Sequence, residues 1–303
     1  MTALPIGLLG CGPWGRLILR DLISLGADVH VWSRSEESRS IARGSGAAAV
    51  YDRTSEFPEC AGFVIATATS VHGDSVRSVA DRGVPIFVEK PLCAHPEEAD
   101  QLVSLCGDRL FVMDKWRYHH GVLDLAAIAR SGELGRVVGL HTTRTGYADN
   151  HPDVDAAWIL APHDLSIALE IVGELGPLRD AVGHVDDLGD VRTLAATFGA
   201  TNGPWHALHV SDRSPVERRE VHLVCESGSA VLESAFAEHL VLRRGAEVEL
   251  RPFASGMPLL DELATFLAYL HGGPAPRSAA CDAASIVRLI AVARSVVGGR
   301  PNG

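Results

Sequence analysis

The hydrophobic pattern of this chain changes character shortly after residue 113. Before that point, short apolar runs typical of buried strands alternate with stretches whose apolar residues recur at helical spacing. The predicted strands are 4–10, 29–33, 63–66, 86–88 and 110–113, and the predicted helices include 71–82 and 96–106. Since parallel strands need crossover helices, this alternation predicts an α/β domain with a doubly wound parallel sheet of the Rossmann type.

From residue 119 onward, a helix at 120–131 is followed by strand-like runs that Gly, Asp and Pro separate. These strands are predicted at 137–145, 191–198, 205–210, 220–225, 230–233, 240–243 and 248–250, and further helices at 162–172, 259–271 and 282–297. Strands joined by short turns predict an α+β domain with a largely antiparallel open sheet. A chain of 303 residues suits two domains, which we place at 1–118 and 119–303.

The composition narrows the class of protein. A formal net charge of -11 argues against nucleic acid and acidic membrane surfaces as partners, because both are bound through clustered Lys and Arg. No apolar run is long enough to cross a bilayer, and no basic region precedes the first one. The six cysteines form no C-x-x-C pair, which fits reduced thiols rather than disulfides or zinc. We expect a soluble, cytoplasmic protein.

A glycine-rich loop follows the first predicted strand and precedes a predicted helix. It reads Gly10, Cys11, Gly12, Pro13, Trp14, Gly15, the G-x-G-x-x-G pattern of dinucleotide sites. In such loops the first glycine permits the tight turn, the second lets the backbone approach the pyrophosphate, and the third allows close helix packing. The alternative is a tight turn without a ligand. The strand and helix around the loop favour a dinucleotide-binding domain.

The end of the second strand bears on which nicotinamide cofactor binds. NAD-preferring sites usually place an acidic residue there to bind the ribose hydroxyls. Here the strand ends in Ser33 and Arg34, and a guanidinium can bind the 2'-phosphate of NADP(H). The alternative is that Arg34 is a solvated loop residue. We expect NADP(H) to be preferred, with NAD(H) possible.

The fifth predicted strand runs into Glu89, Lys90 and Pro91. Ligands of open parallel sheets bind beyond the carboxyl ends of the strands, so Lys90 is well placed for chemistry. A lysine beside a nicotinamide can hydrogen-bond the substrate oxygen that gains or loses a proton. Taken alone, a Glu-Lys pair is usually surface charge.

With these motifs, the chain resembles the glucose-fructose oxidoreductase / inositol dehydrogenase (Gfo/Idh/MocA) family over nearly its whole length. The order Glu89, Lys90, Pro91 is its most specific element. The resemblance implies NAD(P)-dependent oxidation or reduction of a sugar, sugar nucleotide, cyclitol or related carbonyl, with Lys90 catalytic. The supporting elements are the glycine loop, Ala66-Thr67 with His72, Trp116-Arg117-Tyr118, Gly132-Glu133-Leu134-Gly135, and Asp261-Glu262 with Phe266.

The family commonly carries a second catalytic motif, an Asp and a His four residues apart. His163 matches the histidine, whereas Ile159 stands at the aspartate position and can neither orient the ring nor share a proton with it. If Pro162 is the first helical residue, His163 lies near the positive end of the helix dipole, which favours neutral imidazole able to accept a proton. The alternative is a His163 that merely caps or packs.

Other residues could complete the proton-transfer site. Asp164 points about 100° around the helix from His163, so we expect it to cap the helix. Tyr147, His151 and Asp155 precede the helix and could supply a donor. Tyr147 is the strongest of these, since related enzymes without the Asp-His pair can use a tyrosine as acid. A surface tyrosine is equally compatible with the sequence.

Aromatic and basic side chains gather at the expected domain junction. Trp116, Arg117 and Tyr118 could stack on a sugar ring or hold an anionic group, together with the neighbouring histidines. Those adjacent histidines point in different directions and lack a carboxylate at ligand spacing, so no metal is expected. We expect Thr67 and His72 to line the cofactor pocket, although His72 could instead cap the next helix.

The leading hypothesis is therefore hydride transfer on a sugar-like substrate, with Lys90 and His163 handling the proton. Reduction of an imine or another non-sugar carbonyl is an alternative reaction, and Ile159 favours it. A catalytically silent dinucleotide-binding regulator of sugar or redox state is an alternative of another class. We also expect the open face of the second-domain sheet to form a homo-oligomer.

Overall fold

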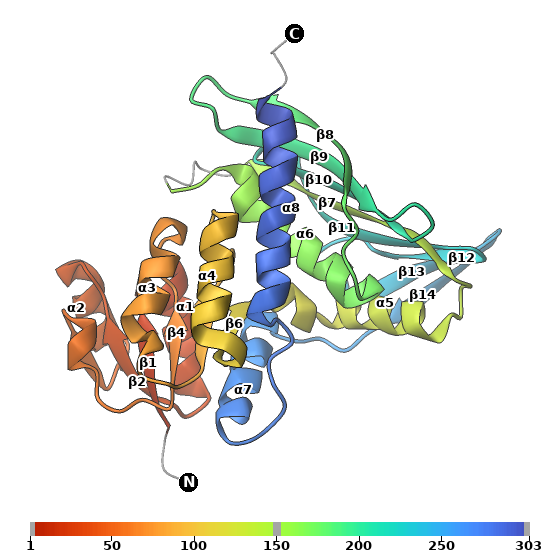
Figure 1. Ribbon diagram of the computed structural model, residues 1–303. Helices are drawn as coiled ribbons and strands as arrows, with labels where there is room; N and C mark the ends of the chain where they lie inside the picture. The colour runs from red at the N-terminus through yellow and green to blue at the C-terminus, as the bar shows by residue number, and fades with distance from the viewer. Residues whose placement is uncertain (1–3, 148–152, 300–303) are drawn as a thin grey trace. The chain divides into compact units, whose positions relative to one another are not determined.

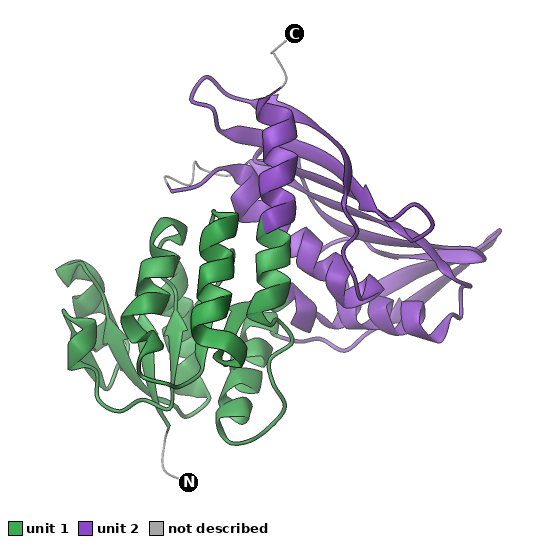
Figure 2. Ribbon diagram, in the orientation of Figure 1, with its two compact units in different colours: residues 1–115, 257–287 green, residues 116–256, 288–303 purple. Residues whose placement is uncertain are grey.

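The computed structural model describes residues 4–147 and 153–299. These residues fall into two compact units, unit 1 with residues 1–115 and 257–287 and unit 2 with 116–256 and 288–303 (Figure 2). A single boundary after residue 118 was expected, whereas the segment 257–287 belongs to the unit of the N-terminal sheet. The reason is packing, because Leu263, Phe266 and Leu267 lie in the hydrophobic core of unit 1.

Unit 1 is built on a parallel sheet whose six described strands follow the order β3-β2-β1-β4-β5-β6 (Figure 1). This is the doubly wound order, so the predicted Rossmann-type domain is confirmed. The order reverses between β1 and β4, and ligands of such sheets bind at that switch point. The strands are β1 (Pro5–Leu9), β2 (Asp28–Trp32), β3 (Ala49–Tyr51), β4 (Gly62–Ile65), β5 (Ile86–Glu89) and β6 (Leu110–Met113).

Helices pack on this sheet in pairs. Helices α3 and α4 contact each other, and α1 contacts α7 (Figure 1). Phe266 of α7 stacks on Phe87 of β5 with ring centroids 5.0 Å apart. The short α2 and β3 are not among the predicted elements. The helices are α1 (Pro13–Ser24), α2 (Glu36–Gly44), α3 (His72–Ala80), α4 (Pro96–Cys106) and α7 (Pro258–Leu270).

Unit 2 contains a sheet whose eight described strands follow the order β14-β13-β12-β11-β7-β10-β9-β8. Only the described pair β10 and β7 runs parallel, so the largely antiparallel sheet is confirmed. The strands are β7 (Val137–Tyr147), β8 (Leu178–Val185), β9 (Val191–Gly199), β10 (Trp205–Ser211), β11 (Arg213–Cys225), β12 (Gly228–Leu232), β13 (His239–Arg244) and β14 (Glu247–Pro252).

Helices α5 (His120–Ser131) and α6 (Ala156–Val172) cover one face of the unit 2 sheet (Figure 1). Leu140 and Leu223 of the sheet and Val122 and Ile167 of the helices meet in its core. The long helix α8 (Ala280–Gly298) belongs to unit 1 up to residue 287 and to unit 2 from residue 288. The other sheet face of unit 2 carries exposed side chains such as His141.

Helix α6 begins six residues earlier than predicted. Asp155 is its N-cap and accepts a hydrogen bond from the Trp158 backbone N–H at 3.3 Å. Pro162 therefore lies inside the helix and not at its first position. Prolines are common at helix starts, which is why the sequence pattern misplaced this one.

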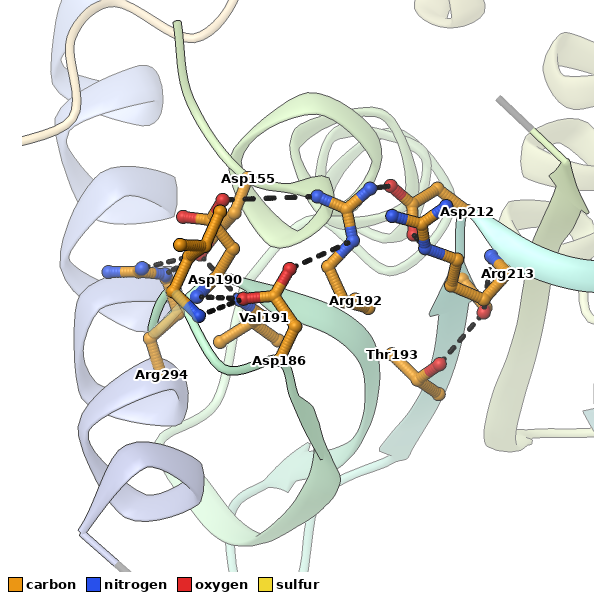
Figure 3. Close-up of polar contacts among 11 residues, drawn as sticks. Asp155, Asp186, Asp190, Val191, Arg192, Thr193, Asp212, Arg213 and Arg294 are labelled. Carbon is orange, nitrogen blue, oxygen red and sulfur yellow. Dashed lines mark hydrogen bonds and ion pairs between the residues drawn. The ribbon is translucent and has the colours of Figure 1, made fainter. Parts of the chain in front are cut away.

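A network of charged side chains fixes the start of α6 in unit 2 (Figure 3). The Asp155 carboxylate also accepts from the Val191 backbone N–H at 3.0 Å and pairs with Arg294 of α8. Next to Val191, the buried Arg192 pairs with Asp212. Asp155 is thus a buried structural residue and not the donor on a loop that the sequence suggested.

Candidate functional site

The glycine loop lies between β1 and α1, and its three glycines have different surroundings. Gly10 has a φ of +95°, and a Cβ there would lie 2.5 Å from the Ala66 carbonyl oxygen. A Cβ on Gly15 would collide with the Gly10 carbonyl oxygen. A Cβ on Gly12 would meet no described atom within 4 Å. Gly10 and Gly15 are therefore required by packing, whereas Gly12 leaves open the approach that a pyrophosphate needs.

The segment after β2 lies at the start of α2. Ser35 caps this helix by accepting from the Ser38 backbone N–H, and Arg34 is exposed. Arg39, one turn into α2, donates to the Ser33 and Arg34 carbonyl oxygens at 2.7 and 3.0 Å. Sequence reasoning missed Arg39 because the helix α2 was not predicted. A second guanidinium thus lies beside the residues expected to select the cofactor.

The Glu-Lys-Pro motif and the glycine loop are joined by a hydrogen bond. Trp14 Nε1 donates to Glu89 Oε1, and the Lys90 backbone N–H donates to Glu89 Oε2 at 3.1 Å. Burial raises the pKa of the Glu89 carboxyl, while Lys90 and Trp14 act in the opposite direction. Lys115 lies over the Trp14 ring, 4.5 Å from its centroid. Glu89 is therefore a buried support that holds the loop beside Lys90.

His72 links two segments at the carboxyl end of the parallel sheet. Its Nδ1 lies 2.8 Å from the Pro91 carbonyl oxygen and its Nε2 lies 3.1 Å from the Thr67 carbonyl oxygen. The ring is buried, and the Thr67 hydroxyl in turn lies 3.1 Å from that of Ser75. Between neutral imidazole and two acceptors only one strong hydrogen bond can form at a time. His72 thus bridges Thr67 and Pro91, and its place in the cofactor pocket stays a prediction.

A cluster of buried carboxyls lies behind the same motif. Burial raises the pKa of Glu262 on α7 well above its usual value, and the neighbouring carboxyls of Glu89 and Asp114 raise it further. Such surroundings favour the protonated form of Glu262. In the sequence, Glu262 stands out only as one of the residues that carry the family resemblance. The local hydrophobic pattern does not predict that Glu262 is buried, because this depends on the packing of α7 in unit 1.

The aromatic and basic residues expected at the domain junction are buried within unit 2. Arg117 Nε donates to Glu170 of α6 at 3.0 Å, so this guanidinium has a carboxylate partner. Trp116 stacks on His119 with ring centroids 5.1 Å apart. The guanidinium of Arg144 lies 4.4 Å from the centroid of the Trp116 ring. Substrate binding by Trp116, Arg117 and the buried Tyr118 stays a prediction.

The structure corrects the expected surroundings of His163. His163 is half-buried in the middle of α6, so it does not lie at the positive end of the helix dipole. Asp164 does not cap the helix, because its buried carboxylate accepts from Arg144 Nε at 2.7 Å. Tyr147 ends β7 and is 73% exposed. His151 lies outside the described residues.

Residues 4–110 match the family model GFO_IDH_MocA, described as an oxidoreductase family with an NAD-binding Rossmann fold. Over this segment, the chain is similar to the Gfo/Idh/MocA family. The glycine loop, Thr67, His72 and the Glu-Lys-Pro motif all fall inside the matched residues.

Two curated relatives match parts of the chain. Inositol 2-dehydrogenase 2 of Saccharopolyspora erythraea is 26% identical over 182 residues, 56% of this chain and 54% of that protein. The 2,7-anhydro-N-acetylneuraminate hydratase of Mediterraneibacter gnavus is 27% identical over 94 residues, 30% of this chain and 25% of that protein. The chain thus spans about half, or less, of the length of these curated relatives.

Solved structures match the chain over nearly its whole length. The UDP-N-acetylglucosamine 3-dehydrogenase of Acidithiobacillus ferrooxidans superposes with a TM-score of 0.87 at 21% identity, covering 99% of each chain. Levoglucosan dehydrogenase in complex with NADH and levoglucosan gives 0.86 at 16% identity and 98% of each chain. At these identities the likeness shows that the whole chain has the fold of these dehydrogenases.

No group of three or more His, Cys, Asp or Glu residues in 4–147 and 153–299 could hold a metal ion. Within the same residues, no helix is both long and apolar enough to span a membrane.

Proposed function

We propose that this chain is an NAD(P)-dependent oxidoreductase acting on a sugar, sugar nucleotide or cyclitol-like substrate. The observation that carries this proposal is the contact between the two family motifs, in which Trp14 of the glycine loop donates to Glu89 beside Lys90. It fixes a lysine next to the site where the pyrophosphate of a dinucleotide would bind. The names of the similar proteins, which include inositol, levoglucosan and sugar-nucleotide dehydrogenases, support the substrate class.

The residues fit a bound dinucleotide. The open space at Gly12 admits the pyrophosphate, and the α1 N-terminus offers backbone N–H groups to it. The nicotinamide would exchange a hydride with the carbon that bears the reacting oxygen. Lys90 would hydrogen-bond that oxygen and stabilise negative charge on it. His163 is our candidate for the second proton carrier, with Tyr147 as the other residue that could serve as acid.

Turnover of sugar pools tests the proposed function. Purified protein is mixed with NADP+ or NAD+ and pools of aldoses, polyols and cyclitols, and the absorbance of the reduced nicotinamide is followed. The proposal predicts cofactor reduction with at least one pool. In the reverse direction, NADPH or NADH is mixed with keto-sugars and imines. Cofactor binding without turnover in either direction would favour the catalytically silent regulator, an alternative that Ile159 supports.

We propose further that NADP(H) is the preferred cofactor. Ser33 and the exposed Arg34, with Arg39 beside them, offer hydroxyl and guanidinium groups to a 2'-phosphate. The substitution Arg34→Asp should shift the ratio of kcat/KM for NADPH over NADH towards NADH, by roughly tenfold or more for a lost charged hydrogen bond. Arg53→Asp, a charge change on another loop of unit 1, is the control. An unchanged ratio in Arg34→Asp contradicts the assignment.

Self-association through the uncovered face of the unit 2 sheet is a further part of the proposal. Among the described residues of that face, apolar side chains are exposed on both edge strands, Val182 on β8 and Leu250 on β14. Exposed apolar sheet faces commonly bind another copy of the chain. A molar mass in solution equal to one chain contradicts this expectation. The cytoplasmic location expected from the scattered cysteines stays a prediction.

A further inference from the structure

Two arginines face each other across neighbouring strands of unit 2. Arg144 on β7 and Arg219 on β11 are direct partners in the register of this antiparallel pair. Both lie on the face that the helices cover, where the Arg144 side chain is 4% exposed and that of Arg219 27%. Like charges directly opposite each other destabilise a sheet, so we expect an interaction that compensates for this arginine pair.

The partners of these arginines do not balance their charge. Arg144 Nε donates to the buried Asp164 Oδ2 at 2.7 Å, and Arg219 donates to the Thr145 and Arg218 carbonyl oxygens at 2.6 and 2.8 Å. Glu217 lies 3.7 Å from Arg219, but its side chain is 74% exposed and its charge is screened by water. Among the described residues, one buried carboxylate therefore faces two guanidiniums.

The pKa shifts of Arg219 and Asp164 also show how burial and neighbouring charges act in this cluster. Burial lowers the pKa of Arg219, and the neighbouring Arg144 lowers it further. Burial also raises the pKa of Asp164, although Arg144 opposes this shift. Each group is thus poorly compensated in the charge state that it carries at neutral pH. An additional negative charge between the arginines would stabilise the charged form of both guanidiniums.

The donor geometry of Arg144 identifies what could supply that charge. To the described residues Arg144 makes one hydrogen bond, from Nε, while Trp116 covers one face of its guanidinium. Its two terminal nitrogens still carry N–H groups, and neither is among the fully buried atoms that lack a partner, so water or a ligand can reach them. Two parallel N–H groups match the two oxygens of a carboxylate or phosphate.

We infer that Arg144 and Arg219 form a binding site for an oxyanion group, a carboxylate or a phosphate, carried by the substrate. Asp164 and Trp116 hold the Arg144 guanidinium in place for this group. His163, the proposed proton carrier, precedes Asp164 by one residue on α6. The inference deepens the proposed function, on which it rests for the ligand being a substrate, and assigns an acidic or phosphorylated sugar derivative.

Simple oxyanions test the site directly. Protein saturated with NADP+, so that the glycine loop is occupied, is titrated with inorganic phosphate or acetate at constant ionic strength while Tm is measured. The comparison is between wild type, Arg219→Gln and the control Arg218→Gln, whose side chain is exposed on the neighbouring position of β11. The site predicts that an anion raises Tm in wild type and control, and that its affinity falls roughly tenfold to a hundredfold in Arg219→Gln.

The two anions distinguish the ligand class, since a larger effect of phosphate assigns a phosphate group and a larger effect of acetate a carboxylate. Arg219→Lys, which keeps the charge but loses the paired N–H groups, should retain part of the affinity. The inference is overturned if neither anion raises Tm above a chloride control, or if Arg219→Gln responds as wild type does.

Turnover of aldoses, uronates and sugar phosphates separates this inference from the proposed function. Preferential turnover of a charged pool that Arg219→Gln loses supports both. Turnover of neutral sugars that Arg219→Gln leaves unchanged keeps the function and overturns the anion site. No turnover with any pool, together with the Tm response described above, overturns the function and keeps the site.

Discussion

Arg144 and Arg192 are both buried in unit 2, yet their surroundings differ in charge. The Arg192 side chain is 3% exposed and pairs with Asp212, with Asp186 at 3.8 Å and Asp190 at 4.0 Å (Figure 3). Arg144 is equally buried, but it shares one carboxylate, that of Asp164, with the opposing Arg219. One arginine lies in an excess of acid and the other in an excess of base.

This difference separates a structural arginine from a functional one. Arg192 connects the turn between β8 and β9 with the end of β10, and its carboxylates come from the chain itself. Arg144 and Arg219 together carry more positive charge than the one buried carboxylate beside them, that of Asp164, neutralises, so the fold accepts a local cost at this place. Local conflicts of this kind are expected at sites that bind a ligand.

The largest effect should come from removing the structural arginine. Arg192→Met removes the buried cation between three aspartates and leaves Asp212 with Arg213, 3.8 Å away, as its remaining partner. Breaking a buried ion pair on one side usually costs about 3 to 5 kcal/mol. Urea unfolding measures this loss in the free energy of unfolding. Arg218→Met, on an exposed arginine of unit 2, should stay within about 0.5 kcal/mol of wild type. Equal stability of both variants would contradict a structural role for Arg192.

A smaller, pH-dependent effect is expected at Asp164. Because burial raises its pKa in the folded protein, the folded state binds the proton more tightly than the unfolded chain does. Stability from this group is present below the unfolded pKa of about 3.9 and falls as the pH rises towards the folded value. The advantage of wild type over Asp164→Asn should therefore shrink as the pH rises above about 4.

Urea unfolding at several pH values measures this advantage. Asp187→Asn, on an exposed aspartate, should show no such trend. An advantage of wild type that grows with pH would mean that Arg144 and Arg219 dominate over burial, and that the excess of base is smaller than we infer.

The smallest effect on stability should come from the functional pair. Arg219→Gln removes a like charge directly opposite Arg144, so the free energy of unfolding should rise by up to about 1 kcal/mol, or stay unchanged. Chemical denaturation beside Arg218→Gln checks the sign. A loss as large as that of Arg192→Met would show that Arg219 is itself structural and would weaken the case for an anion site.

Unit 1 could be predicted well because its signals are local. The glycine loop, the buried strands and the Glu-Lys-Pro motif are each read from neighbouring residues, and the structure places them as a doubly wound sheet requires. The elements that were missed are those with little hydrophobic contrast. Helix α2 buries Ala42 alone among its described residues, and β3 has no fully buried residue.

Unit 2 was harder to predict because its site depends on tertiary contacts. Pro162 suggested a helix start, yet Asp155 caps the helix and the proline is accommodated inside it. The pairing of Arg144 with Asp164 joins a strand to a helix, and its opposition to Arg219 depends on the register of β7 and β11. Neither follows from local periodicity. The same holds for the pairing of Arg117 with Glu170, and substrate binding by Arg117 stays a prediction.

The substitution Lys90→Met tests whether Lys90 serves hydride transfer beside a bound dinucleotide. With the sugar pool that wild type turns over, kcat should fall by about 100-fold to 10,000-fold, as for loss of a group that assists proton transfer. The affinity for NADP+, measured in the same preparation, should stay close to that of wild type. A kcat near the wild-type value would show that Lys90 does not assist the reaction.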